Sequence, residues 1–149
     1  DASASFIGLT SRHRYGDLVR AVVDGIAFAS YDCYSAMGAP PAEVRLSGGA
    51  ARSAAMRRIL AAVLNTNVRS SRREEAGAAG TAMIAAVALG QYATMEDCVA
   101  AWASPLLGAS EAPDERLAAT YRAIFPSYLE ARQALKPVWR GIANARTGK

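Results

Sequence analysis

A strand candidate that runs directly into a pair of glycines is the part of this sequence whose residue types can do chemistry. Residues 44–47 (VRLS) are followed at once by Gly48 and Gly49, and a helical pattern begins near Ser53. Glycine has no Cβ, so a ligand can come close to the backbone and a positive φ is accessible. The free N–H groups and positive dipole end of a following helix favour an anion such as phosphate. Ser53 can either cap that helix or offer its hydroxyl to a ligand.

This glycine turn is a weak motif when it is taken alone. No Lys-Ser/Thr pair follows the glycines, so the motif is not the Walker pattern, and it does not match G-x-G-x-x-G. Strand-to-helix turns with two glycines also occur where nothing binds. From the residues alone, a phosphate or nucleotide site and a plain turn both stay open.

The elements that must position this turn alternate along the first part of the chain. Apolar residues at three- and four-residue steps indicate helices, and two short segments between them are strand candidates. The predicted order is helix, strand, helix, strand, helix, at residues 17–37, 44–47, 53–64, 68–70 and 76–89. Asp17 suits the N-terminus of the first helix, and the Ala- and Gly-rich last helix is expected to be a tightly packed core helix. Such alternation favours an α/β fold with parallel strands.

The last third of the sequence is predicted to be helical. A Thr-x-x-Asp capping box predicts a short helix over 94–102, and a loop is expected over 104–113. Two more helices are predicted over 114–126 and 127–140, because Pro126 must kink the chain or make it restart. Two strands are too few for a stable sheet, so either strands have been missed or the sheet continues outside this chain. The absence of an initial Met and of a strand before the first helix led us to expect a missing N-terminal part.

Composition narrows the classes of function. Of the 149 residues, 52% are hydrophobic and 20% charged, which indicates one globular domain rather than a disordered tail. Cys33 and Cys98 are expected to be reduced, buried thiols. The sequence has one histidine and no CxxC pair, so we expect no zinc site. The 17 basic residues are scattered without interleaved aromatic residues, so we expect no nucleic-acid binding. The uncharged run near residue 80 is too short for a membrane span.

Three blocks of the sequence resemble signatures of the FGGY carbohydrate kinases. Residues 4–9 (ASFIGL) and 17–27 (DLVRAVVDGIA), seven residues apart, look like the first. Residues 46–64 (LSGGAARSAAMRRILAAVL) resemble the family's nucleotide-binding segment, and residues 75–83 (EAGAAGTAM) resemble its next helix. The blocks follow the family's order and spacing, and the tail over 121–139 is similar to those of xylulokinase-like and erythritol-kinase-like members.

The resemblance implies the fold of the chain. It implies an α/β fold, part of an actin-like, ribonuclease H-like ATPase domain, which is the C-terminal domain of a sugar kinase with additional C-terminal helices. An α/β nucleotide-binding part is expected over 1–103, and a C-terminal helical extension over 104–149.

The resemblance also implies cofactors and site residues. ATP would lie in a cleft between two domains, with Mg²⁺ assisting phosphoryl transfer. Gly48 and Gly49 would contact the phosphate and ribose side of ATP, and Ser53 would hydrogen-bond adenine. Met56 and Arg58 depart from the bulky residue and the glutamine that are common in the family at those positions.

No catalytic residue and no metal ligand is predicted in this chain. The family's base, sugar-binding residues and first phosphate loop lie in its N-terminal half and have no counterpart here, so the isolated chain is expected to be inactive. Asp17 is expected to cap its helix, and Asp24 and Asp32 to lie on a helix surface or in caps. Residues 72–75 (RREE) are read as a solvated charged turn, with Arg73 facing phosphate across the cleft as the alternative.

The implied partners are the missing N-terminal kinase domain and a small sugar or polyol, in the cytoplasm. The aromatic residues of the last third, such as Trp102 and Trp139, are candidates for a homodimer surface. Two other functions stay open: a non-enzymatic assembly or interaction domain, and an ATP-binding regulator of the actin-like superfamily.

Overall fold

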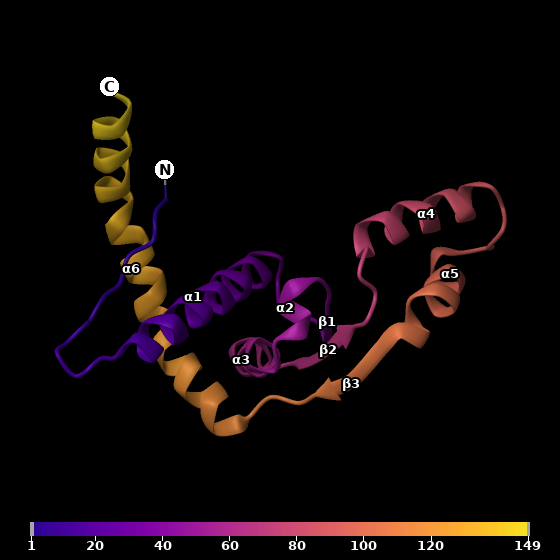
Figure 1. Ribbon diagram of the computed structural model, residues 1–149, viewed down its shortest axis with the longest axis horizontal. Coiled ribbons are helices and arrows are strands. Elements are labelled where there is room, and N and C mark those ends of the chain that lie inside the picture. Colours follow the sequence, from indigo (N-terminus) through magenta and orange to yellow (C-terminus); the bar gives the residue numbers. More distant parts are fainter. Residues whose placement is uncertain (1, 149) are drawn as a thin grey trace.

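The first helix lies within two residues of its predicted bounds at both ends. The computed structural model describes residues 2–148, and α1 spans Tyr15–Ala36 (Figure 1). The Arg14 N–H donates to Oδ2 of Asp17 at 2.8 Å, so the predicted capping role of Asp17 is confirmed. Gly38, with φ of 120°, follows the end of the helix in a conformation that favours glycine.

A three-stranded sheet lies at the centre of the chain. Its strands are β1 (Glu43–Leu46), β2 (Asn67–Ser71) and β3 (Leu107–Glu111), in the order β1-β2-β3. The first two are parallel, as predicted, and the buried Val44 and Val68 lie opposite each other. Two helices, α2 (Gly49–Arg52) and α3 (Ala54–Leu64), connect them. The parallel strand pair that the alternation of helices and strands predicts is therefore confirmed.

Strand β3 replaces a segment that the sequence predicts as a loop. A short 3₁₀ turn, η1 (Ser104–Leu106), leads into β3, which pairs antiparallel with β2. The prediction of a loop over 104–113 is therefore wrong for residues 107–111. Gly, Ala, Ser and Glu are poor strand formers, so the local sequence pattern gives no sign of this strand. Pairing with β2 imposes it instead. The division of the chain at residue 104 remains a prediction, and β3 adds a strand to the sheet from beyond that point.

Gly108 of β3 lies where a side chain would meet a neighbour, and this gives a testable prediction. A Cβ there would lie 2.8 Å from Oγ of Ser70, next to the register shift between Arg69 and Ser71. We expect Gly108→Ala to lower the free energy of unfolding by about 1 kcal/mol, as overpacking does. Urea unfolding should show that the loss disappears in the Ser70→Ala background. An equal loss in both backgrounds would mean that this contact is not the cause.

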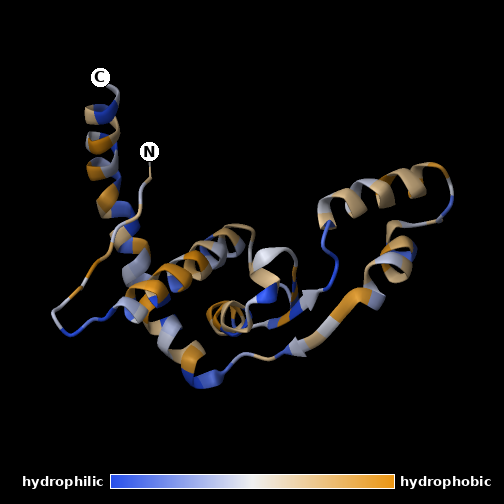
Figure 2. Cartoon of the chain, viewed as in Figure 1, coloured by the Kyte–Doolittle hydropathy of each residue, from blue (hydrophilic) through white to orange (hydrophobic). Residues whose placement is uncertain are grey.

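The core forms around α3, whose residues 59–64 are all buried. This helix packs against β2 on one side and against α1 and α6 on others, so its second half is enclosed while its first residues stay exposed. Figure 2 shows the strongly hydrophobic part of α3 between the sheet and α1. The ring of Phe28 on α1 meets that of Tyr121 edge-on at 5.5 Å, and the rings of Phe125 and Tyr128 lie at 5.8 and 5.2 Å. The aromatic side chains of residues 121, 125 and 128 therefore complete this core.

The last helix, α6 (Glu115–Thr147), is continuous through both of its prolines. The chain does not restart at Pro126, and Figure 1 shows one helix that changes direction along its length. A proline removes one helical hydrogen bond, which favours a break. Here Phe125 and Tyr128, on either side of Pro126, both pack on Phe28, and this packing holds the two parts together.

Helices α4 (Ala76–Ala88) and α5 (Met95–Trp102) pack on each other and extend away from the sheet (Figure 1). Only Ala79 and Ala86 of α4 are buried, so the prediction of a tightly packed core helix is wrong for the described chain. Small side chains all round a helix permit close packing on any face and do not say whether a partner is there.

The start of α5 and the two cysteines also bear on the predictions. The hydroxyl of Thr94 accepts from the Asp97 N–H at 3.1 Å, which confirms Thr94 as the N-cap of α5. The Asp97 carboxylate accepts from the same hydroxyl at 2.8 Å and not from the Thr94 N–H, so only half of the predicted capping box is present. Cys98 is fully buried, but Cys33 is exposed, so the expectation of two buried thiols is correct for one of them. Cys33 lies on the outward face of α1.

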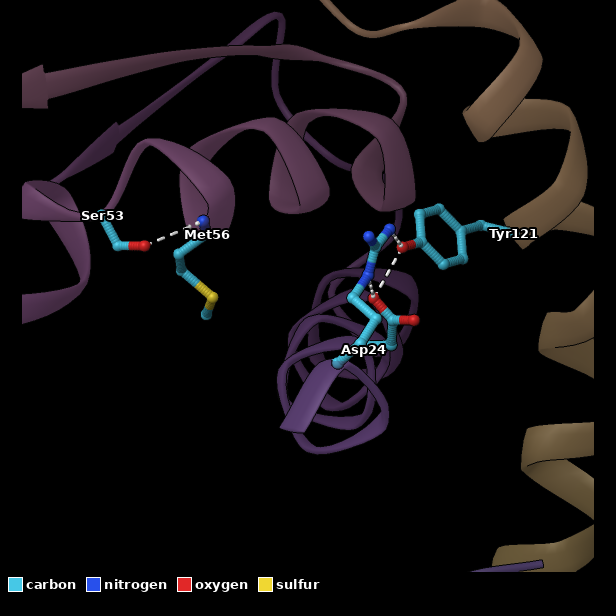
Figure 3. Close-up of polar contacts among 5 residues, drawn as sticks. Asp24, Ser53, Met56 and Tyr121 are labelled. Carbon is cyan, nitrogen blue, oxygen red and sulfur yellow. Dashed lines mark hydrogen bonds and ion pairs between the residues drawn. The ribbon is translucent and has the colours of Figure 1, made fainter. Parts of the chain in front are cut away.

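Two aspartates that were expected on a helix surface join α1 to α6. The Tyr121 hydroxyl donates to Oδ1 of Asp24 and accepts from Arg20, both at 2.6 Å (Figure 3). About two turns further along α1, Asp32 pairs with Arg132 of α6. These pairs could not be found from local pattern because their members are about 100 positions apart in the sequence.

The Tyr121 hydroxyl makes this junction sensitive to alkali. Burial, and then the hydrogen bond to Asp24, raise the pKa of Tyr121 above its ordinary value of 10, against the lowering effect of Arg20. Because the folded-state pKa is the higher one, the contribution to stability is complete below pH 10 and is lost as the pH rises through the folded-state pKa. The ionised oxygen could no longer donate to Asp24.

We therefore expect the free energy of unfolding to fall more steeply above about pH 10 in the wild type than in Tyr121→Phe. Urea unfolding at a series of pH values from about 8 to about 11 measures both slopes. Equal slopes in the two proteins would show that Tyr121 does not carry the effect.

Candidate functional site

The glycine pair opens a single turn of helix that the sequence does not predict, and the helix predicted over 53–64 follows it as α3. Gly48 has φ of 74° and ψ of −157°, a conformation that is essentially restricted to glycine, and it precedes α2. Backbone bonds from Ala51 to Gly48 (3.2 Å) and from Ser53 to Ala50 (3.3 Å) close this turn. The longer α3 then begins after Ser53.

Ser53 is the N-cap of α3. Its Oγ accepts a hydrogen bond from the Met56 N–H at 3.2 Å (Figure 3), which confirms the capping role that the sequence allowed. The cap uses an acceptor lone pair, so the hydroxyl proton can still be donated to a ligand. Ser53 is also exposed. Capping and ligand contact are therefore compatible at this residue.

Open space lies in front of the two glycines. A Cβ built on Gly48 or Gly49 would have no atom within 4 Å, and both residues are exposed. The adjoining pocket has a volume of about 290 Å³ and lies between α2 and the end of β2. Ligand pockets usually exceed about 300 Å³, so this one accommodates part of a nucleotide. The turn thus fits a bound phosphate group at the level of backbone access.

Basic side chains make the pocket favourable for an anion. Arg52 comes from α2, and Arg72 and Arg73 come from the turn after β2. Arg52 lies 3.8 Å from Glu74, and both side chains are largely exposed, so this pair is weak and can open. The pocket therefore has positive charge that is free to meet a ligand.

The charged turn over residues 72–75 is only partly solvated. Arg72 and Glu74 are exposed, as predicted, but the half-buried Arg73 donates to the carbonyl oxygen of Trp102. That carbonyl belongs to the last residue of α5, which has no helical partner, so Arg73 holds the end of this helix. The alternative role of Arg73 toward phosphate stays a prediction.

Arg57 is a residue of this site that sequence reasoning missed. It donates to the carbonyl oxygen of Ala51 in α2 and to the carboxylate of Glu111 in β3. Its place four residues after Ser53 gave a weak sign that it lies near the start of α3. Nothing local could indicate Glu111, because its strand was not predicted.

Residues 2–148 contain neither a metal-binding cluster nor a membrane-spanning helix. This part of the chain has no group of three His, Cys, Asp or Glu side chains that could hold a metal ion. It also has no helix that is long and apolar enough to cross a membrane. His13 is exposed and interacts with Thr10 through Nδ1, in keeping with a surface role.

The fold and the site first define a class: an α/β domain with a parallel strand–glycine–helix unit that is open to an anion. Residues 1–89 match the C-terminal domain of the FGGY family of carbohydrate kinases, and the chain belongs to this family. The predicted family is therefore confirmed.

The named relatives and solved structures that the chain resembles are also carbohydrate or polyol kinases. The chain is 58% identical over 146 residues to an erythritol kinase from Brucella abortus, covering 98% of this chain and 28% of that protein. It is 34% identical over 101 residues to a xylulose kinase from Staphylococcus epidermidis, covering 66% of this chain and 20% of that protein. A ligand-bound xylulose kinase structure from Lactobacillus acidophilus superposes with a TM-score of 0.80 at 30% identity, over 90% of this chain and 27% of that one.

These comparisons confirm the predicted fold class, because this mixed α/β chain with its C-terminal helices superposes over 90% of its length on solved structures of sugar kinases. The chain spans about 28% of the length of the erythritol kinase that it resembles.

Proposed function

We propose that this chain is the ATP-binding C-terminal part of a longer carbohydrate kinase. The complete enzyme would transfer the γ-phosphoryl group of ATP to a hydroxyl of a small sugar or polyol. The observation that carries the proposal is the Gly48–Gly49 turn, which is open to a ligand and lies in the segment that matches the kinase family. The remaining length of the relatives leaves room for the N-terminal kinase domain as its partner.

In this proposal the turn binds and orients the nucleotide. The backbone N–H groups of Gly48 and Gly49 donate to phosphate oxygens, and Arg52 contributes positive charge beside them. The Ser53 hydroxyl donates to the adenine while it caps α3. Mg²⁺, when bound, supplies charge neutralisation at the phosphates, and its protein ligands would come from outside the described residues.

The acceptor is proposed to be a polyol of the size of erythritol. The support is the 58% identity to an erythritol kinase, compared with 34% to a xylulose kinase and 30% to a gluconokinase from Bacillus licheniformis. The catalytic base and the acceptor-binding residues belong to the N-terminal domain in this proposal. We place the enzyme in the cytoplasm, where ATP is available and the free thiols Cys33 and Cys98 stay reduced. A homodimer stays part of the proposal; because Tyr121 and Tyr128 pack in the core, Trp102 and Trp139 are the candidates for its surface.

A phosphotransfer screen of the complete polypeptide tests this function. ATP would be supplied with erythritol, other tetritols and pentitols, xylulose, glycerol and gluconate, and ADP release would be followed. We expect release that depends on the acceptor, with the highest kcat/KM for a polyol. ATP binding without transfer to any acceptor would favour the regulator, and no nucleotide binding at all would favour the assembly domain.

A further inference from the structure

One arginine joins the three elements that surround the glycine turn. Arg57 lies in the first turns of α3, and its Nη1 donates to the carbonyl oxygen of Ala51 in α2 at 2.6 Å. Its Nε donates to Oε1 of Glu111, the last residue of β3, at 2.5 Å. The side chains of Arg57 and Glu111 are 19% and 27% exposed, so water screens this ion pair much less than it screens an exposed one.

The bond to Ala51 supports an element that cannot support itself. Helix α2 has four residues, and a helix of one turn is far too short to be stable alone. Its final carbonyl groups have no partner within the helix, and Arg57 satisfies one of them. Because α2 begins at Gly49, the direction of its N–H groups depends on where α2 is held.

Glu111 in turn holds the guanidinium group. A carboxylate and a guanidinium group form short, strong, directional hydrogen bonds. Glu111 lies opposite Val68, a fully buried residue of β2, so the carboxylate is attached to the rigid part of the sheet. Hydrogen bonds therefore connect the sheet, through Glu111 and Arg57, to Ala51 and the glycine turn.

We propose that Arg57, fixed by Glu111, is a positioning residue of the nucleotide site: it sets the direction of the N–H groups of the Gly48–Gly49 turn through Ala51. This proposal rests on the proposed function, since it assigns the turn to nucleotide phosphate. An arginine is needed because its planar fork reaches two acceptors at once, whereas a lysine offers a single point charge.

Three variants of the complete polypeptide test the proposal. Arg57→Met removes both hydrogen bonds at similar length, and Glu111→Gln weakens the hold on the guanidinium group with little change of shape. Arg132→Met is the matched control, because Arg132 also forms a partly buried ion pair, with Asp32, but at the junction of α1 and α6.

Three measurements are made on each protein. Hydrogen exchange of the peptide that covers residues 48–53 reports on the turn without any ligand. Calorimetry with ADP reports on the site, and steady-state kinetics separate KM for ATP from kcat and from KM for the acceptor.

For Arg57→Met we expect faster exchange at the turn and about a tenfold rise in Kd for ADP and in KM for ATP, which corresponds to about 1.4 kcal/mol. The kcat at saturating ATP and the KM for the acceptor should stay within about twofold. Glu111→Gln should have a smaller effect of the same kind, and it carries the test if Arg57→Met does not fold. Arg132→Met should leave exchange at the turn and ADP binding unchanged.

The proposal is overturned if the wild type binds ADP and Arg57→Met binds it equally well, or if Arg132→Met has the same effects as Arg57→Met. If the wild type binds no ADP, the proposed function fails as well, and this result is distinct from the other two.

Discussion

Replacing the two glycines of the turn by alanine will have very different consequences for stability. We expect Gly48→Ala to lower the free energy of unfolding by about 1–3 kcal/mol, because Gly48 has a φ of 74° that a residue with a Cβ adopts only under strain. Gly49 has no positive φ and opens a helix, so Gly49→Ala should change stability by less than about 0.5 kcal/mol. Urea unfolding of the two variants measures the difference.

The same two positions separate folding from binding. A larger side chain at Gly49 would fill the open space through which a phosphate reaches the backbone. We therefore expect Gly49→Leu in the complete enzyme to raise Kd for ADP at least about tenfold, a loss of about 1.4 kcal/mol, while the protein stays folded. Calorimetry measures the binding, and the thermal midpoint without nucleotide reports on folding.

Ala36→Leu is a matched control, since Ala36 is an exposed helical residue at the far end of α1. It adds the same side chain without filling the space before the turn, so ADP binding should not change. Normal ADP binding by Gly49→Leu would remove the glycine turn from the nucleotide site.

The parts of the fold that local sequence determines were predicted correctly. Asp17, Thr94 and Ser53 cap helices as their spacing indicates, and the parallel strands contain the buried Val44 and Val68. Each of these features depends on residues within a few positions of one another, or on one apolar pattern. The glycine turn belongs to the same class, because only glycine suits the backbone there.

The parts that failed depend on contacts between distant residues. Strand β3 forms because β2 offers it hydrogen bonds, although its residues are poor strand formers. The ion pair of Arg57 with Glu111 spans 54 positions, so the support of the glycine turn could not be predicted. For helix α4 the error is that core packing was predicted and is not found. Its Ala-rich sequence suits a core, but in the described chain it packs on α5 and leaves Ile84 exposed.

Truncating Phe28 should have the largest effect on the stability of the described fold. Its ring is 7% exposed and contacts three aromatic rings of α6, on both sides of Pro126. We expect Phe28→Ala to lower the free energy of unfolding by about 3–5 kcal/mol, because it removes a buried ring and leaves a cavity that α6 cannot fill. Helix α6 should then bend more freely at Pro126, since the packing that holds its two parts together is lost.

Urea unfolding followed by far-ultraviolet circular dichroism measures this loss, and hydrogen exchange across residues 115–130 reports on α6. Tyr15→Ala is the control: it truncates a ring on the same helix that is 81% exposed, and it should change stability by less than about 0.5 kcal/mol. Equal losses in the two variants would mean that the aromatic contacts of Phe28 do not hold α6 on α1. A loss confined to Phe28→Ala, with faster exchange in α6, would show that one ring couples the C-terminal helix to the layer that positions the glycine turn.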